Sequence, residues 1–150
     1  MAGRGFEVVG SYKDKDIALP KRGTGASAGY DLSAAESVVI APGEMVMVPT
    51  GVKAYMEPDE VLYIHIRSSL AVKRQLVLMN SVGVVDADYY NNPDNEGHIF
   101  IALWNRGREP VEIVAGERLA QGVFMKYLTV DEDEAGAGKD RQGGFGSTGK

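Results

Sequence analysis

Short β-rich runs separated by Pro and Gly turns constrain the fold of this chain more than any other feature. The clearest turns are Ala-Pro-Gly at 41–43, Pro-Thr-Gly at 49–51 and Glu-Pro-Asp-Glu at 57–60. The runs cover 38–40, 45–48, 52–56, 61–66, 75–79, 97–104, 111–114 and 122–128. Only 69–74 has a helical pattern. This alternation predicts an all-β fold, a jelly-roll β-barrel or sandwich with one short helix.

Composition narrows the chemistry that such a fold could perform. A chain of 150 residues is long enough for one domain with one core. It contains no cysteine, which excludes disulfides, thiolate zinc sites and cysteine nucleophiles. Its two histidines, His65 and His98, argue against a multi-histidine metal site.

Charge and hydropathy set the expected partners. The net charge of −5 argues against binding to a nucleic-acid polymer, but a single nucleotide could be held by a few local arginines. The first residues have no apolar signal region, and no apolar stretch is long enough to span a membrane. We therefore expect no membrane partner and a cytoplasmic location.

The C-terminal end has a composition that no packed core could use. Residues 141–150 read RQGGFGSTGK, so Arg141 and Phe145 stand among four glycines. The acidic run at 131–134 and the sequence AGAG at 135–138 precede them, as in a solvated linker. We expect a β domain at 1–130, followed at 131–150 by a linker and a flexible lid. The lid would pair Arg141 with phosphate and stack Phe145 on a base, and the alternative is a disordered terminus.

Several other residues are most simply structural. His65 lies in an alternating run without a second ligand nearby, which favours a strand histidine over a catalytic one. The methionines that fall in strands are expected in the core: Met45, Met47, Met56, Met79 and Met125. Trp104 is expected in the core or in a subunit interface.

Five motifs occur in order along the chain. They are AGYDLSAA at 28–35, RSSLA at 67–71, NSVGVVDADY at 80–89, GERLAQGVF at 116–124 and the glycine-rich tail. Together they resemble the trimeric dUTP pyrophosphatase (dUTPase) family over nearly the whole chain. The resemblance implies a homotrimer with shared active sites that uses Mg²⁺. It also implies hydrolysis of dUTP to dUMP and pyrophosphate by attack of water on the α-phosphorus, which limits uracil in DNA and supplies dUMP for thymidylate synthesis.

The third motif carries the reaction and base recognition in this resemblance. Asp86 would be the general base, since a carboxylate that is ionised at neutral pH can accept a proton from water. Without the resemblance, the Asp-Ala-Asp sequence would indicate hairpin turn chemistry, and Asp88 is a second candidate. Tyr89 would lie against the deoxyribose and leave no room for a 2′-hydroxyl. The residues expected to read uracil are Asn80, Gly83, Ile99 and Phe100.

The remaining motifs would bind the phosphates and the metal. Arg67, Ser68 and Ser69 end a strand and open the short helix, where serines alternatively serve as N-caps. Gln121 and Arg141 would contact phosphate, and Phe145 would stack over uracil. Asp31 would reach Mg²⁺ through water, although alone it would be taken for a turn residue. The resemblance also assigns the phosphate motifs, the Asp86 hairpin and the tail of each pocket to three different subunits.

One segment departs from the family pattern. Family members usually turn tightly after the tyrosine of the third motif, whereas this chain inserts YNNPDNE at 90–96, which predicts a longer loop of the kind found in some bacterial and phage members.

Two rival functions share the predicted fold. One is dCTP deaminase, whose catalytic glutamate pattern does not occur here, and the other is a nucleotide-gated regulatory protein.

Overall fold

The computed structural model describes residues 3–135 and 141–146, and its elements are almost all strands. The strands are β1 (Gly5–Val8), β2 (Tyr30–Ser33), β3 (Val38–Ile40), β4 (Met45–Pro49), β5 (Val52–Tyr55), β6 (Glu60–Ile66), β7 (Leu76–Leu78), β8 (Gly83–Asp86), β9 (Phe100–Asn105), β10 (Val111–Ile113) and β11 (Arg118–Lys126). The helical elements are α1 (Ser68–Arg74) and the 3₁₀ turns η1 (Gly10–Tyr12) and η2 (Ala87–Tyr89).

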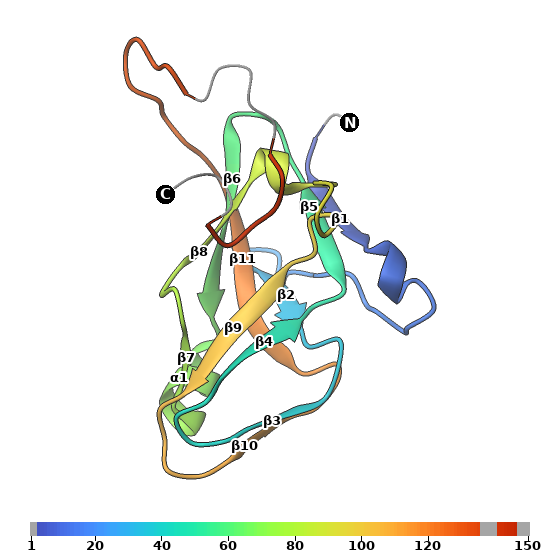
Figure 1. Ribbon diagram of the computed structural model, residues 1–150, viewed down its shortest axis with the longest axis vertical. Helices are drawn as coiled ribbons and strands as arrows, with labels where there is room; N and C mark the ends of the chain where they lie inside the picture. The colour runs from blue at the N-terminus through green and yellow to red at the C-terminus, as the bar shows by residue number, and fades with distance from the viewer. Residues whose placement is uncertain (1–2, 136–140, 147–150) are drawn as a thin grey trace.

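The strands form small antiparallel sheets that pack as a sandwich (Figure 1). One sheet has the order β2-β11-β6-β8 and another the order β4-β9-β7, while β1 pairs with β5 and β10 pairs with β3. Consecutive neighbours such as β9 and β4 are far apart in sequence, as a jelly roll requires. The predicted all-β jelly roll is thus confirmed. Within 3–135 and 141–146, however, every sheet ends in an edge strand, so no barrel is closed by hydrogen bonds.

The core lies between the sheets and is built from the alternating apolar positions of the strands. In β6, Leu62 and Ile64 point inward while His65 is exposed on the other face. The large residues with almost no solvent exposure come from most strands and include Leu32, Ile40, Leu62, Leu76, Ile101, Leu103, Ile113 and Leu119. Burial of these side chains supplies the main stabilisation of the fold.

The expectation that the strand methionines belong to the core is wrong for four of the five. Met56 is buried, whereas the relative exposures of Met45, Met47, Met79 and Met125 are 44%, 36%, 52% and 52%. Met45 lies opposite Trp104 in the β4–β9 pair, and Trp104 is also 36% exposed. Met45, Met47, Met125 and Trp104 stand on outer faces of the sheets, because strand neighbours alternate between the two faces, whereas Met79 lies in the turn after β7.

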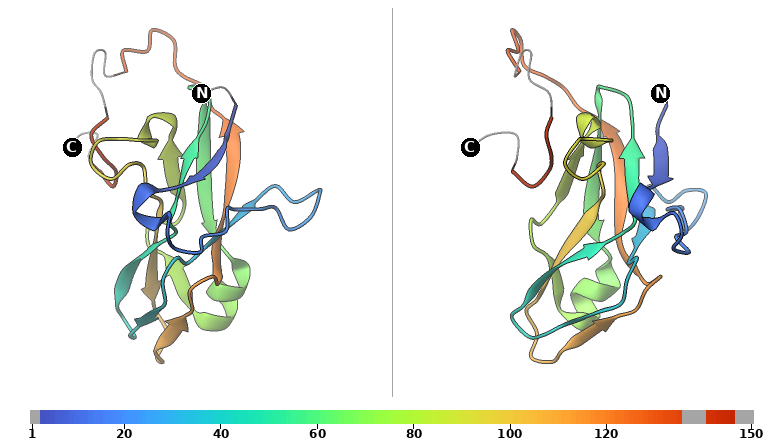
Figure 2. Two further views of the ribbon diagram at one scale, coloured as in Figure 1. Left: turned by 90° about the vertical axis from the view of Figure 1, so that its right-hand side faces the viewer. Right: turned by 45° about the vertical axis from the view of Figure 1, so that its right-hand side comes forward.

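The one predicted helix is confirmed as α1, which starts one residue earlier than expected. Leu70 anchors it to the core, and Gln75 ends it with a left-handed φ of 54°. Figures 1 and 2 show α1 at one end of the sandwich and the described tail segment beside β8, toward the other end. None of the helices in the described part of the chain is long and apolar enough to cross a membrane.

Candidate active site

A pocket of about 290 Å³ opens where the edge strand β8 faces the start of β9. Strand β7 ends at Leu78, and its last contact with β9 is the hydrogen bond from Met79 N–H to Ala102 O. The chain then turns away, so among the residues that the structure describes the edge of β9 that faces β7 has no strand beside it from Phe100 to Ile101. The pocket is lined by Ile64, Asn80, Val82, Gly83, Val84, Val85, Asp86, Tyr89, Ile99, Phe100, Arg141, Gly144, Phe145 and Gly146. Its size and its few polar groups on apolar walls are typical of small-ligand sites.

Asp86 stands at the mouth of this pocket. It is the last residue of β8 and lies opposite Val61 of β6, and η2 begins directly after it. Its side chain is 52% exposed, so a water molecule can reach the carboxylate. Asp88 follows on η2 but is not part of the pocket lining.

Tyr89 forms a buried wall of the pocket, with only 6% of its surface exposed. Its hydroxyl donates to His98 O at 2.5 Å and accepts from Asn95 Nδ2 at 3.0 Å. Burial raises the pKa of the phenol, even though the Asn95 hydrogen bond and the Arg141 charge oppose that shift. The phenol therefore stays neutral at physiological pH and can serve as a fixed steric surface.

The tail reaches the pocket and places Arg141 on the aspartates. Arg141 Nη1 lies 2.7 Å from Asp86 Oδ2 and 3.2 Å from Asp88 Oδ1, and the guanidinium stands 5.2 Å from the centre of the Tyr89 ring. Burial disfavours the charged guanidinium, but the hydrogen bonds and charges of the two aspartates outweigh it and raise the pKa of Arg141.

Close approach to the buried Tyr89 ring requires glycine at one position of the tail, and a second tail glycine lies beside the exposed side chain of Asp94. A Cβ at Gly144 would stand 2.7 Å from Tyr89 Cε1, and one at Gly143 would stand 2.8 Å from Asp94 Oδ2. Next to them, Phe145 lines the pocket with a left-handed φ of 51° and remains 61% exposed. The ring is thus available to stack on a ligand. Other parts of the predicted linker and lid, 136–140 and 147–150, lie outside the described residues.

The backbone groups expected to read uracil divide into two kinds. Because β8 is an edge strand, half of its N–H and C=O groups point away from β6, which leaves donors and acceptors near Gly83 for a ligand. Ile99 is different, because its N–H donates to Val52 O while its carbonyl accepts from both the N–H and the hydroxyl of Thr50. The backbone of Ile99 is therefore already engaged. Phe100 and Asn80 also line the pocket, but the carbonyl of Asn80 accepts from Val82 N–H.

The predicted phosphate cradle does not lie at this pocket within one chain. Asp86 of β8 pairs with Val61 near the start of β6, whereas Arg67 follows the other end of β6 and donates its N–H to Leu119 O of β11. Six residues of strand separate these positions, which is about 20 Å at about 3.3 Å per residue. Arg67, Ser68 and Ser69 therefore stand at the α1 end of the sandwich.

Asp31 and Gln121 are also remote from Asp86. They pair with each other across β2 and β11, and Asp31 lies three strand spacings from β8, which is about 14 Å. Asp31 Oδ2 is 3.5 Å from Arg118 Nη1, and the Gln121 side chain fills the space that a Cβ at Gly29 would need. No group of three or more His, Cys, Asp or Glu residues that could hold a metal ion occurs in 3–135 or 141–146.

A larger hollow of about 450 Å³ lies beyond the C-terminal end of α1. Its walls carry charges of both signs, including Lys73, Arg108, Glu109 and Glu112. Without an aromatic ring in that lining it has no surface on which a base could stack, so the β8 pocket is the better candidate.

The sequence did not reveal the polar contacts that the 90–96 loop makes with Tyr89. Asn95 and Asn92 were assigned to a loop from their turn-forming character alone, and both hydrogen-bond to Tyr89. Their distance from Tyr89 along the chain is short, but side-chain direction within a loop is not encoded by periodicity. The high density of Asn and Asp was the only signal of local hydrogen bonding.

Known proteins identify the family of the chain. The dUTPase family profile matches residues 15–149. A deoxyuridine 5′-triphosphate nucleotidohydrolase from Lactococcus lactis is 59% identical over 146 residues, which is 97% of each chain. The chain belongs to the dUTPase family. A second dUTPase relative, from Methylococcus capsulatus, is 38% identical and spans 97% of this chain and 96% of its own.

Solved dUTPase structures share the fold described above. The crystal structure of dUTPase from Streptococcus mutans superposes with a TM-score of 0.81 at 56% identity and covers 85% of this chain and 98% of its own. A dUTPase from phage phi11 of S. aureus, in which a structural Mg(II) ion is coordinated, reaches a TM-score of 0.74 at 21% identity, covering 89% of this chain and 96% of its own.

Proposed function

We propose that this chain hydrolyses dUTP to dUMP and pyrophosphate, with the nucleoside in the β8 pocket. The observation that carries the proposal is the position of Asp86. Its exposed carboxylate stands at the mouth of a pocket walled by Tyr89 and the β8 edge, under a tail that bears Arg141 and Phe145. On this proposal Asp86 is the general base, Tyr89 lies against the sugar, the β8 edge reads the nucleobase, Arg141 binds phosphate and Phe145 stacks on the nucleobase.

The reaction assigns Asp86 the role of general base. It takes a proton from a water molecule whose oxygen forms a bond to the α-phosphorus, while the bond between that phosphorus and the bridging oxygen of the β-phosphate breaks. The electron pair of that bond leaves with pyrophosphate. Arg141 Nη1 holds Asp86 Oδ2 in this structure, so the guanidinium would have to move from Asp86 to the terminal phosphate, a group that arginine can bind through two parallel hydrogen bonds.

Uracil recognition would use the outward-facing groups of β8 near Gly83, together with Asn80 and Phe100. Cytosine presents a donor where uracil presents an acceptor, so a mismatch would leave a buried group unpaired. Phe145 would cover the base once the tail has closed and would exclude bulk water. On this proposal residues 1–130 form the catalytic domain and 131–150 form its linker and lid, in a cytoplasmic enzyme.

Mg²⁺ would be bound chiefly by the triphosphate, with Asp31 reaching it through water. The residues fit that arrangement because Asp31 is a single carboxylate and the ion retains its waters readily. When bound, the ion supplies charge compensation for the phosphates. Asp31 would exchange its contact with Arg118 for this role.

The active sites would be shared within a homotrimer. The separation of Arg67 from Asp86 along β6 supports this, because a triphosphate whose phosphorus atoms are joined by single bridging oxygens cannot span about 20 Å. The cradle that serves a given Asp86 must then come from another chain. Met45 of β4 and Trp104 of β9 lie opposite each other and form an exposed apolar surface, which a contact with another subunit would cover.

Release of pyrophosphate from dUTP, dCTP, dTTP and UTP tests this function. We expect turnover of dUTP alone at low substrate concentration. The Asp86→Asn variant should bind dUTP but lose most of its turnover, because the amide keeps the shape of the side chain and cannot accept the proton. Turnover close to that of the unaltered protein would exclude Asp86 as the base.

A further inference from the structure

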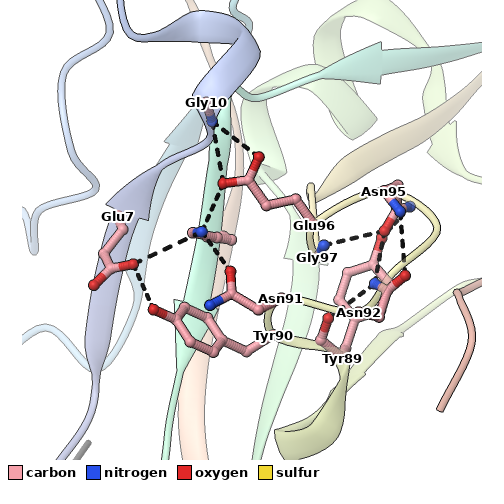
Figure 3. A network of polar contacts seen from close by, with 10 residues as sticks. Glu7, Gly10, Tyr89, Tyr90, Asn91, Asn92, Asn95, Glu96 and Gly97 are labelled. Carbon is pink, nitrogen blue, oxygen red and sulfur yellow. Dashed lines mark hydrogen bonds and ion pairs between the residues drawn. The ribbon is translucent and has the colours of Figure 1, made fainter.

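The loop 90–96, which departs from the family pattern, is a tightly bonded structure around Tyr89 (Figure 3). Asn92, which is buried, donates from Nδ2 to Tyr89 O at 2.9 Å and to Asn95 Oδ1 at 2.7 Å. Its Oδ1 accepts from the N–H groups of Asp94 and Asn95 at 3.0 and 3.2 Å. The amide of Asn92 thus organises the turn so that Asn95 faces the phenol.

Asn95 completes the hydrogen bonding of the Tyr89 hydroxyl. Its Nδ2 donates to Tyr89 Oη at 3.0 Å, while the hydroxyl donates to His98 O at 2.5 Å. Asn95 Oδ1 is itself held by Asn92 Nδ2 and by the N–H of Gly97. Tyr89 is therefore held at both ends, with its backbone carbonyl bonded to Asn92 and its hydroxyl bonded to Asn95 and to the carbonyl of His98.

The loop is also anchored to the neighbouring sheet. Glu96 accepts hydrogen bonds from Lys53 Nζ at 2.6 Å and from Gly10 N–H at 3.0 and 3.1 Å. Lys53 also donates to Asn91 Oδ1, and the Lys53 hydrogen bond is the main reason that the pKa of Glu96 is lowered. These contacts tie the loop to β5 and η1, so Asn95 is held by a rigid framework.

We propose that Asn95 is a specificity-positioning residue that fixes the Tyr89 ring at the depth needed to exclude ribose. The inference rests on the proposed function, in which Tyr89 is the wall against the 2′-hydroxyl. A steric wall discriminates only if it does not yield, and a displacement of about 1 Å is enough to degrade a site whose supporting residues are loose. Tyr89 supplies the surface, and Asn95 prevents the surface from moving.

The experiment measures the ratio of kcat/KM for dUTP to kcat/KM for UTP. Asn95→Ala removes the donor, Tyr89→Phe removes the hydroxyl but keeps the ring, and Tyr89→Ala removes the wall. We expect the first two variants each to lower the ratio about tenfold, the scale of one net hydrogen bond, chiefly by raising kcat/KM for UTP. Tyr89→Phe also removes the hydrogen bond to His98 O, so its effect should be at least as large as that of Asn95→Ala. The double variant Tyr89→Phe with Asn95→Ala should lower the ratio no further than Tyr89→Phe alone, because the Asn95 hydrogen bond to the hydroxyl is already absent in that variant.

Asn91→Ala is the matched control. It removes an asparagine of the same loop and its bond to Lys53, but no bond to the phenol. It should lower the melting temperature and leave the dUTP/UTP ratio unchanged. An equal fall of the ratio in Asn91→Ala would show that any loosening of the loop suffices and would overturn the role of Asn95.

The outcomes separate this inference from the function on which it rests. If Tyr89→Ala lowers the ratio but Asn95→Ala does not, the wall stands and the positioning role is wrong. If Tyr89→Ala leaves the ratio unchanged, Tyr89 is not the sugar wall and the proposed role of Tyr89 itself fails. Additive effects of Tyr89→Phe and Asn95→Ala would likewise overturn the inference.

Discussion

Mixed oligomers of two inactive variants provide the most direct test of the shared site. In Asp86→Asn the base is lost, and in Arg67→Ala the phosphate cradle is impaired. The structure places these residues about 20 Å apart in one chain, since six residues of β6 and its continuation separate them at about 3.3 Å each. A base that acts through one water must lie next to the α-phosphorus, so the two residues cannot serve the same nucleotide within one chain.

The expected size of the recovery follows from symmetry. In a cyclic trimer, each pocket joins the hairpin of one chain to the cradle of the next. Any trimer that contains both variants then has one pocket in which an intact Asp86 meets an intact Arg67. Mixed trimers should therefore regain about one third of the activity of the unaltered trimer.

Co-expression with two different affinity tags and sequential purification would isolate the mixed oligomers. Pyrophosphate release from dUTP is then measured, with native mass spectrometry to verify their composition and thermal unfolding to verify the fold of each variant. The two homo-oligomers mixed just before the assay are the control and should stay inactive. Absence of activity in verified mixed trimers would refute the reasoning, because every pocket would then draw both residues from one defective chain.

Three further outcomes are expected. Gly144→Ala should lower kcat/KM for dUTP and expose the tail to proteases, because its Cβ would stand 2.7 Å from Tyr89 Cε1; an unaffected tail would disprove the observed docking. Mixed trimers of Asp86→Asn and a chain truncated after Gly138 should regain activity, because fifteen residue steps from Lys126 to Arg141 can extend about 50 Å and would let the tail exchange the hairpin of its own chain for that of a neighbour; no recovery would assign the tail to its own hairpin, where Arg141 contacts Asp86. Burial lowers the pKa of His98, so as the pH falls the imidazole takes up a proton in the unfolded chain before it does so in the folded one. The free energy of unfolding, measured in urea, should therefore be constant above about pH 6.5 and decrease below it, and a flat profile would contradict this.

The sequence determined the fold class because that depends on local signals. Turn residues at 41–43, 49–51 and 57–60 bound the strands wherever they occur, and alternating residues such as Leu62 and Ile64 mark a buried face in any sheet. The family resemblance named Asp86 and Tyr89, and the glycine-rich composition of the tail singled out Arg141 and Phe145; the structure places all four in the lining of one pocket.

Only the tertiary structure decided which groups are free to act. Local sequence could not show that Met45 faces outward, because the face that a strand buries depends on what packs against it. It could not show that the backbone groups of Ile99 are hydrogen-bonded to Thr50 and Val52. Nor could it show that about 20 Å separates Arg67 from Asp86, since both findings follow from pairing between strands that are distant in sequence. The direction of Asn95 toward Tyr89 likewise depends on its loop, whose Glu96 is held by Lys53 of β5, in another sheet.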